Sequence, residues 1–223
     1  MICYKRKYLI LLIILLSIIA GPTFAQTLAP QFAAVPPPAP GRSSTPAREM
    51  PGPALHAELK RGGYTIFLRH TSTDFSRDDV KSRSDDDCDN QRPLTDKGRD
   101  EARRIGNELR KLGIPISDVL ASPRCRTVEV AKLAFGNYKI APEARGGVFT
   151  DKPVTRYEGL RALFDKGPGA GKITVIVSHG NPFYATAGAP YLAEGEAAII
   201  KSLGKDFEVI ARVRWDGWGA LAP

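Results

Sequence analysis

Two histidines and three arginines of this chain stand at the ends of short apolar segments. Segment 64–68 leads into Arg69 and His70, segment 119–121 into Arg124 and Arg126, and segment 173–177 into His179. Short apolar runs bounded by polar residues predict buried strands. Because ligands bind in the crevice at the carboxyl ends of the strands of an open α/β sheet, we expect these side chains to meet in one pocket.

Such a group of side chains is suited to bind and transfer a phosphoryl group. Guanidinium groups match phosphate oxygens with forked donors, and Arg126 falls in the first turn of an expected helix, whose free backbone amides attract anions. Neighbouring cations lower the pKa of a histidine and keep its imidazole neutral. A neutral imidazole can attack phosphorus while the arginines neutralise the charge on the equatorial oxygens.

Four motifs in chain order resemble those of the histidine phosphatase superfamily, which has the phosphoglycerate mutase-like fold. They are Leu68-Arg69-His70-Thr71, Gln91-Arg92-Pro93-Leu94-Thr95-Asp96-Lys97-Gly98, Ser122-Pro123-Arg124-Cys125-Arg126-Thr127 and Val177-Ser178-His179-Gly180. The resemblance, which covers most of 64–213, implies that His70 carries the phosphoryl group during turnover. The side chains that bind this group are then Arg69, Arg126 and His179. The resemblance implies no metal ion and no organic cofactor.

Within the superfamily, the chain resembles small exported enzymes that include the lipopolysaccharide core heptose phosphate phosphatases. This resemblance implies a phosphoric monoester hydrolase acting on a small phosphorylated substrate, for which an envelope phosphosugar is a reasonable expectation. The acid phosphatase and phytase branch carries an aspartate directly after the second histidine. Gly180 follows His179 here, so that branch is disfavoured.

The proton donor to the leaving group stays open between two acidic residues. Asp74 lies four residues after His70, and Glu143 lies downstream of the second motif, but neither stands in a context that assigns it. A non-catalytic module that binds a phosphorylated ligand in the same pocket is therefore the alternative function. A mutase is disfavoured by the expected export of the chain and by the sequence around Glu143.

Strands and helices alternate along the chain. The expected strands are 64–68, a run around Val119, 138–141, a run from Ile173, 197–203 and 207–213, and the expected helices are 54–60, one from Thr95 to Leu112, one through Val128 to Phe135, and 155–165. Thr95 is expected to cap its helix and Gly113 to end it. This alternation predicts an α/β domain, a three-layer α/β/α sandwich with a mostly parallel central sheet.

The N-terminal part of the chain predicts export rather than a fold. Residues 1–25 combine a basic start, an apolar run over 8–20 and a small-residue site, which predicts a signal peptide cut after Ala25. An uncleaved anchor is the alternative, although the run is shorter than the roughly 20 apolar residues of a spanning helix. Residues 26–53 are rich in proline and alanine and predict a disordered tether. The phosphatase-like domain then covers 54–223, in a periplasmic or secreted protein that the tether could hold near a membrane.

The expected export determines whether the cysteines can form a disulfide. Cys3 leaves with the signal peptide, and Cys88 and Cys125 remain as a pair in an oxidising compartment. This predicts a disulfide between them, with two buried free thiols as the alternative.

The net charge and the acidic run 85–89 bear on two other classes of ligand, metal ions and nucleic acids. The acidic run 85–89 lacks the glycine and the closing glutamate of a calcium loop, which favours a solvated loop near the pocket over a metal site. The net charge is +8 for the chain and +5 after residue 25, and both signs are interleaved along the helix after Thr95. Nucleic-acid binding needs a one-sided basic stripe, so a nucleic-acid partner is not expected.

Overall fold

The computed structural model of the chain describes residues 50, 52–147 and 157–222, all within the unit Pro36–Pro223. The expected signal peptide and nearly all of the expected tether lie outside the described residues, so both stay predictions. No helix in the described ranges is long and apolar enough to cross a membrane.

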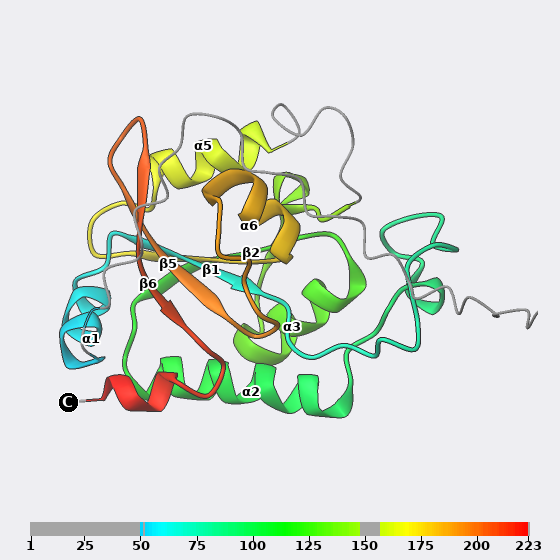
Figure 1. Cartoon of the computed structure of the whole chain (residues 1–223). Coiled ribbons are helices and arrows are strands. Elements are labelled where there is room, and N and C mark those ends of the chain that lie inside the picture. Colours follow the sequence, from blue (N-terminus) through cyan, green and yellow to red (C-terminus); the bar gives the residue numbers. More distant parts are fainter. Residues whose placement is uncertain (1–49, 51, 148–156, 223) are drawn as a thin grey trace, which may run out of the picture. The chain divides into compact units, whose positions relative to one another are not determined.

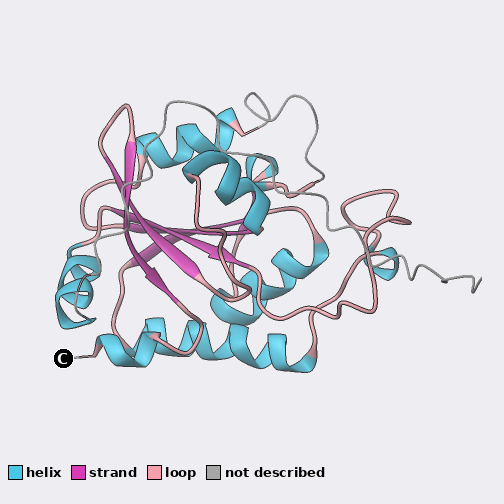
Figure 2. Ribbon diagram, in the orientation of Figure 1, coloured by secondary structure: helices cyan, strands magenta, loops and turns pink. Residues whose placement is uncertain are grey.

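The expected strands and helices are present. The strands are β1 (Tyr64–Arg69), β2 (Ile116–Ala121), β3 (Lys139–Ile140), β4 (Ile173–Ser178), β5 (Ala197–Ser202) and β6 (Phe207–Val213). The helices are α1 (Gly52–Arg61), α2 (Asp96–Lys111), α3 (Cys125–Phe135), α5 (Glu158–Lys166) and α6 (Gly180–Ala187), with short 3-10 turns η1 (Cys88–Asn90), η2 (Pro142–Ala144) and η3 (Trp218–Leu221). Helix α6 was not expected. Figure 2 shows where these elements lie along the ribbon.

One mixed, mostly parallel sheet holds all six strands in the order β3-β2-β4-β1-β5-β6. The first four strands in this order pair in parallel, and β5 and β6 close the other edge as an antiparallel hairpin. In the register of β1 and β4, Arg69 stands opposite Ser178. Each of these residues directly precedes a histidine, so His70 and His179 leave the same edge of the sheet on neighbouring strands.

Helices cover both faces of the sheet, which confirms the three-layer prediction (Figure 1). Alternate residues of a strand point to opposite faces, and Ile66 and Leu68 of β1 pack with α1, α2 and α3 while Phe67 packs with α5 and α6. The apolar positions predicted for the helix after Thr95 are all buried in the first of these two cores: Leu94, Ala102, Ile105, Leu109 and Leu112.

Helix α2 also anchors the segment that leaves β1. Thr95 caps the helix as predicted, since its Oγ1 accepts a hydrogen bond from the Gly98 N–H at 3.0 Å. The buried carboxylate of Glu101 accepts hydrogen bonds from the backbone N–H of Ser72 at 3.0 Å and from its hydroxyl at 2.9 Å. A Cβ at Gly98 would lie 2.0 Å from the Ser72 carbonyl oxygen, so only glycine permits this close approach. The backbone just beyond His70 is thereby held in place.

Candidate active site

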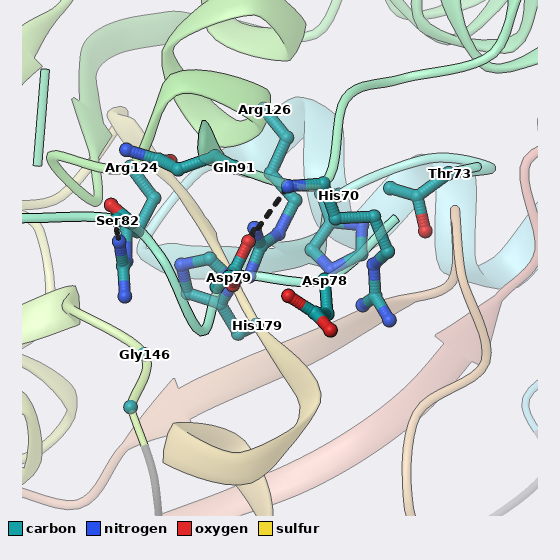
Figure 3. A network of polar contacts seen from close by, with 12 residues as sticks. His70, Thr73, Asp78, Asp79, Ser82, Gln91, Arg124, Arg126, Gly146 and His179 are labelled. Atoms are coloured by element: carbon teal, nitrogen blue, oxygen red, sulfur yellow. Dashed lines mark hydrogen bonds and ion pairs between the residues drawn. The ribbon is translucent and has the colours of Figure 1, made fainter. Parts of the chain in front are cut away.

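The four predicted site residues meet in one pocket of about 380 Å³ at the carboxyl ends of β1 and β4. Its described lining consists of Arg69, His70, Asp79, Val80, Arg92, Arg124, Arg126, Gly146, Gly147, His179, Gly180, Asn181 and Tyr191. Figure 3 shows the labelled side chains of His70, Arg126 and His179 facing the same space. The rings of His70 and His179 are 5.4 Å apart, centroid to centroid.

His70 is buried and held in one tautomer. Its Nδ1 lies 3.0 Å from the Thr71 carbonyl oxygen. A carbonyl oxygen only accepts, so Nδ1 carries the proton and Nε2 keeps a free lone pair. Burial lowers the pKa of His70 well below its ordinary value, and the nearby charges of Arg126 and Arg69 lower it further. The imidazole is therefore neutral at neutral pH, with a nucleophilic Nε2.

His179 is oriented by a hydroxyl and by close backbone packing. Its Nε2 is 2.8 Å from Ser122 Oγ, and its Nδ1 has no hydrogen-bond partner among the described residues. Burial, followed by the charge of Arg126, lowers its pKa well below the ordinary value. A Cβ at Gly146 would come 2.5 Å from His179 Cδ2, so only glycine lets the backbone approach the ring this closely.

Arg69 is fixed by the segment between α6 and β5. Its Nη1 donates to the Leu192 carbonyl at 2.6 Å, its Nη2 lies 3.5 Å from Glu194 Oε1, and the Tyr191 ring lies against its guanidinium, 5.3 Å from Cζ to the centroid. The Glu194 carboxylate also accepts hydrogen bonds from the hydroxyl and the backbone N–H of Thr73, at 2.7 and 3.1 Å. Glu194 thus ties the strand end to the loop beyond it.

Arg126 lies in the first turn of α3, as predicted, and pairs with a carboxylate. Its Nη1 and Nη2 donate to Asp79, at 3.0 Å to Oδ1 and 2.9 Å to Oδ2. Asp79 Oδ1 also accepts from the backbone N–H of Arg92 at 2.8 Å. Burial raises the pKa of Asp79, but the hydrogen bonds from Arg126 and from the Arg92 amide outweigh burial and bring the pKa below its ordinary value.

Four buried nitrogens in the pocket wall lack a partner among the described residues: Arg69 Nε, Arg92 Nε, Arg126 Nε and His179 Nδ1. A buried polar nitrogen without a hydrogen bond is costly, and most buried polar groups in native proteins have a partner in protein, water or ligand. Four such nitrogens around one cavity are the arrangement expected of a site built for an anion with several oxygens.

The segment 71–93 is tied to α3 beside Arg126. Cys88 and Cys125 form a disulfide, with Cα atoms 5.6 Å apart, which confirms the predicted pairing. Next to it, Gln91 Oε1 accepts from the backbone N–H of Cys125 at 3.1 Å. Arg124 Nη1 donates to Ser82 Oγ at 3.0 Å. The acidic loop therefore lies at the pocket mouth.

The acidic run itself makes ion pairs and turns. Asp85 pairs with Arg145, Nε to Oδ1 at 2.8 Å, and lies 3.6 Å from Arg124 Nε. Asp87 accepts from the backbone of Arg83. Among the described residues, no three histidine, cysteine, aspartate or glutamate side chains cluster as they would around a metal ion.

The chain matches the histidine phosphatase superfamily, branch 1, over residues 65–148. This range contains His70 and Arg126 and ends before His179. It therefore supports the resemblance of the first three motifs. No curated protein matches the chain.

Solved structures similar to this chain include the protein histidine phosphatase SixA complexed with tungstate, at 22% identity and a TM-score of 0.47, covering 68% of this chain and 97% of that one. YhfR of Bacillus stearothermophilus is 20% identical with a TM-score of 0.48, covering 66% and 94%. A protein of Thermus thermophilus, TTHB049, is 17% identical with a TM-score of 0.46, covering 68% and 99%.

Neither candidate acid of the histidine phosphatase resemblance reaches the described pocket lining. Asp74 turns back on its own loop, where its Oδ1 accepts from the hydroxyl and the backbone N–H of Ser76 at 2.7 and 2.9 Å. Glu143 is exposed on η2. The acid that lines the pocket is Asp79, which sequence reasoning missed. The third histidine, His56, is half-buried and bonds the Leu112 carbonyl oxygen at 2.9 Å, away from the pocket lining.

Proposed function

We propose that this protein is an exported phosphatase that hydrolyses a phosphomonoester through a phosphohistidine on His70. The observation that carries the proposal is the hydrogen bond from His70 Nδ1 to the Thr71 carbonyl, which leaves an unprotonated Nε2 in a buried pocket lined by arginines. The family match over residues 65–148 supports phosphatase chemistry for such a pocket.

The reaction has two steps. His70 Nε2 attacks phosphorus and the bond to the leaving oxygen breaks, while Arg69 and Arg126 neutralise the charge that spreads over the phosphoryl oxygens. A water molecule then attacks the phosphohistidine, the N–P bond breaks, and inorganic phosphate leaves. The nucleophile and the groups that neutralise the phosphoryl oxygens are all side chains of the pocket lining.

His179 acts as a further donor to the phosphoryl group in this scheme. If Ser122 Oγ–H donates to His179 Nε2, the imidazole proton resides on Nδ1, the nitrogen without a described partner. A neutral imidazole then donates one hydrogen bond to a phosphoryl oxygen without adding a charge that would repel the arginines.

The substrate we propose is a small envelope phosphosugar of the lipopolysaccharide core heptose phosphate kind. Its support is the predicted export through residues 1–25 and the resemblance of the motifs to the small exported branch. The pocket volume of about 380 Å³ suits a ligand of that size. Detection of the protein in a periplasmic fraction, with an N-terminus beginning at Gln26, tests the export.

Phosphate release from p-nitrophenyl phosphate and a panel of phosphosugars tests the activity, with acid-quench trapping of phosphoenzyme. His70→Ala should abolish release and trapping, whereas His56→Ala, which removes a histidine outside the pocket lining, should leave both unchanged. Phosphate binding without release from any ester would refute the phosphatase and favour the non-catalytic binding module.

A further inference from the structure

In this structure, the Arg126 guanidinium, which the proposed reaction needs for the phosphoryl group, is bound to the Asp79 side chain of the same protein. Both terminal nitrogens of Arg126 donate to the Asp79 carboxylate, at 3.0 and 2.9 Å (Figure 3). A phosphoryl group that takes these two donors must therefore displace Asp79.

A carboxylate and a phosphate can bind a guanidinium in the same geometry, so they compete for Arg126. Each accepts two parallel hydrogen bonds from the fork of a guanidinium. The Arg126 side chain is only 8% exposed, whereas that of Asp79 is 27% exposed. Asp79 thus occupies the solvent side of the pair, and its departure leaves Arg126 in place beneath the pocket.

The segment that carries Asp79 is held at its ends by backbone pairing and a disulfide, and in its middle by polar side-chain contacts. Thr73 bridges to Leu94 at one end, and the Cys88–Cys125 disulfide fixes the other. The residue next to Asp79, Val80, is 86% exposed. Movement of Asp79 therefore breaks polar contacts without removing an apolar side chain from either core.

We propose that Asp79 is the proton donor to the leaving group, released for this role when the substrate phosphoryl group replaces its carboxylate on Arg126. This inference rests on the proposed phosphatase function. The displaced Asp79 carboxylate first takes up a proton from solvent. His70 Nε2 then forms its bond to phosphorus while the P–O bond breaks, and the Asp79 carboxylic acid gives its proton to the leaving oxygen. In the second step the Asp79 carboxylate takes a proton from the attacking water as the N–P bond breaks.

The exchange changes the acidity of Asp79 in the direction the reaction requires. In the free protein, the hydrogen bonds from Arg126 and the Arg92 amide hold the pKa of Asp79 below its ordinary value despite burial. Loss of the Arg126 bonds removes one cause of this lowering, and a negatively charged phosphoryl group beside the acid raises the pKa. The carboxyl group becomes a proton donor only once substrate is bound.

Phosphate binding tests the exchange without turnover. Calorimetric titration with inorganic phosphate should show binding at least about tenfold tighter in Asp79→Asn than in the wild type, because a charged competitor for Arg126 is gone. Asp78→Asn is the matched control, since its carboxylate accepts only from the backbone of Val80 among the described contacts, and it should bind phosphate as the wild type does. Unchanged or weaker binding by Asp79→Asn overturns the exchange.

Leaving-group dependence tests the proton transfer. An alkyl phosphate needs protonation of its leaving oxygen far more than p-nitrophenyl phosphate does, so the ratio of kcat/KM values for the two substrates isolates the acid. Asp79→Asn should lower the alkyl-to-aryl ratio about 100-fold or more, Asp79→Glu should restore part of it, and Asp78→Asn should not change it. A disturbed loop would lower the activity toward both substrates, so it would not change the ratio of their kcat/KM values. Thermal melting identifies a variant that fails to fold.

The outcomes separate the two proposals. A wild type that releases phosphate from neither ester refutes the phosphatase, and the acid with it, whatever the binding result. If the wild type releases phosphate but Asp79→Asn leaves the alkyl-to-aryl ratio of kcat/KM unchanged, the role of Asp79 is overturned and the phosphatase stands. The same conclusion follows if Asp78→Asn, and not Asp79→Asn, lowers that ratio.

Discussion

The disulfide between Cys88 and Cys125 allows a quantitative prediction about the free energy of unfolding of the protein. It closes a loop across 37 residues of sequence and joins the acidic segment to the first turn of α3. The chain-entropy relation for a cross-link of this span gives a stabilisation of about 4 kcal/mol, through loss of conformational freedom in the unfolded chain. Replacing both cysteines by serine should therefore lower the free energy of unfolding by about 2–4 kcal/mol, since cross-links often deliver less than this relation predicts.

Urea unfolding of the purified protein measures this difference. The control is the reductant dithiothreitol, which should destabilise the wild type by the same amount and leave the Cys88→Ser, Cys125→Ser double variant unaffected. Equal stability of the wild type and the double variant to within about 1 kcal/mol would refute the reasoning. So would mass spectrometry of the non-reduced protein that finds the two cysteines unlinked.

Three further predictions concern the pocket. Arg126→Ala should lower kcat/KM by about 10²–10³-fold in a phosphatase assay, because it removes donors to developing charge. Burial and the nearby arginines hold the pKa of His70 below that of an unfolded-state histidine, so the unfolded chain binds the proton first and stability falls as the pH drops below about 6.5. His70→Asn should make this fall shallower in urea titrations, by at most about 1.4 kcal/mol per pH unit. Gly146→Ala, whose Cβ would lie 2.5 Å from His179 Cδ2, should lower kcat while Gly169→Ala, with open space around its Cβ, should not.

The sequence predicted the convergence of the histidines and arginines because regular patterns carry that information. Apolar runs locate the strands, and parallel pairing brings their carboxyl ends together, so Arg69 and His179 could be placed without knowledge of any contact. Helix α6 was missed because it opens with Gly-Asn-Pro, a composition typical of turns. Pro182 lies in the first turn of the helix, where its missing N–H breaks no intrahelical bond.

Asp79 and Glu194 could not be assigned in the same way. Both lie in irregular segments, where no periodicity indicates which side chain turns inward. Asp79 is one of many acidic residues between β1 and α2, and only the path of the loop across the pocket selects it. The one available signal was the predicted Cys88–Cys125 link, which ties that acidic segment to the arginines of the second motif.

The acidic loop balances the charge of the free pocket. Among the described residues, four arginines line the pocket, and without a ligand their mutual repulsion is unfavourable in a buried setting. Asp79 neutralises Arg126, and Asp85 lies beside Arg124. For Arg92, no carboxylate of the described residues lies within ion-pair distance, and its guanidinium stacks on the Phe75 ring at 4.5 Å. In the proposed exchange, a phosphoryl dianion takes over the charge-neutralising role of Asp79 and brings a further negative charge close to Arg92. The acidic loop can therefore stabilise the pocket without ligand, and the proposed phosphoryl group can still displace Asp79 from Arg126.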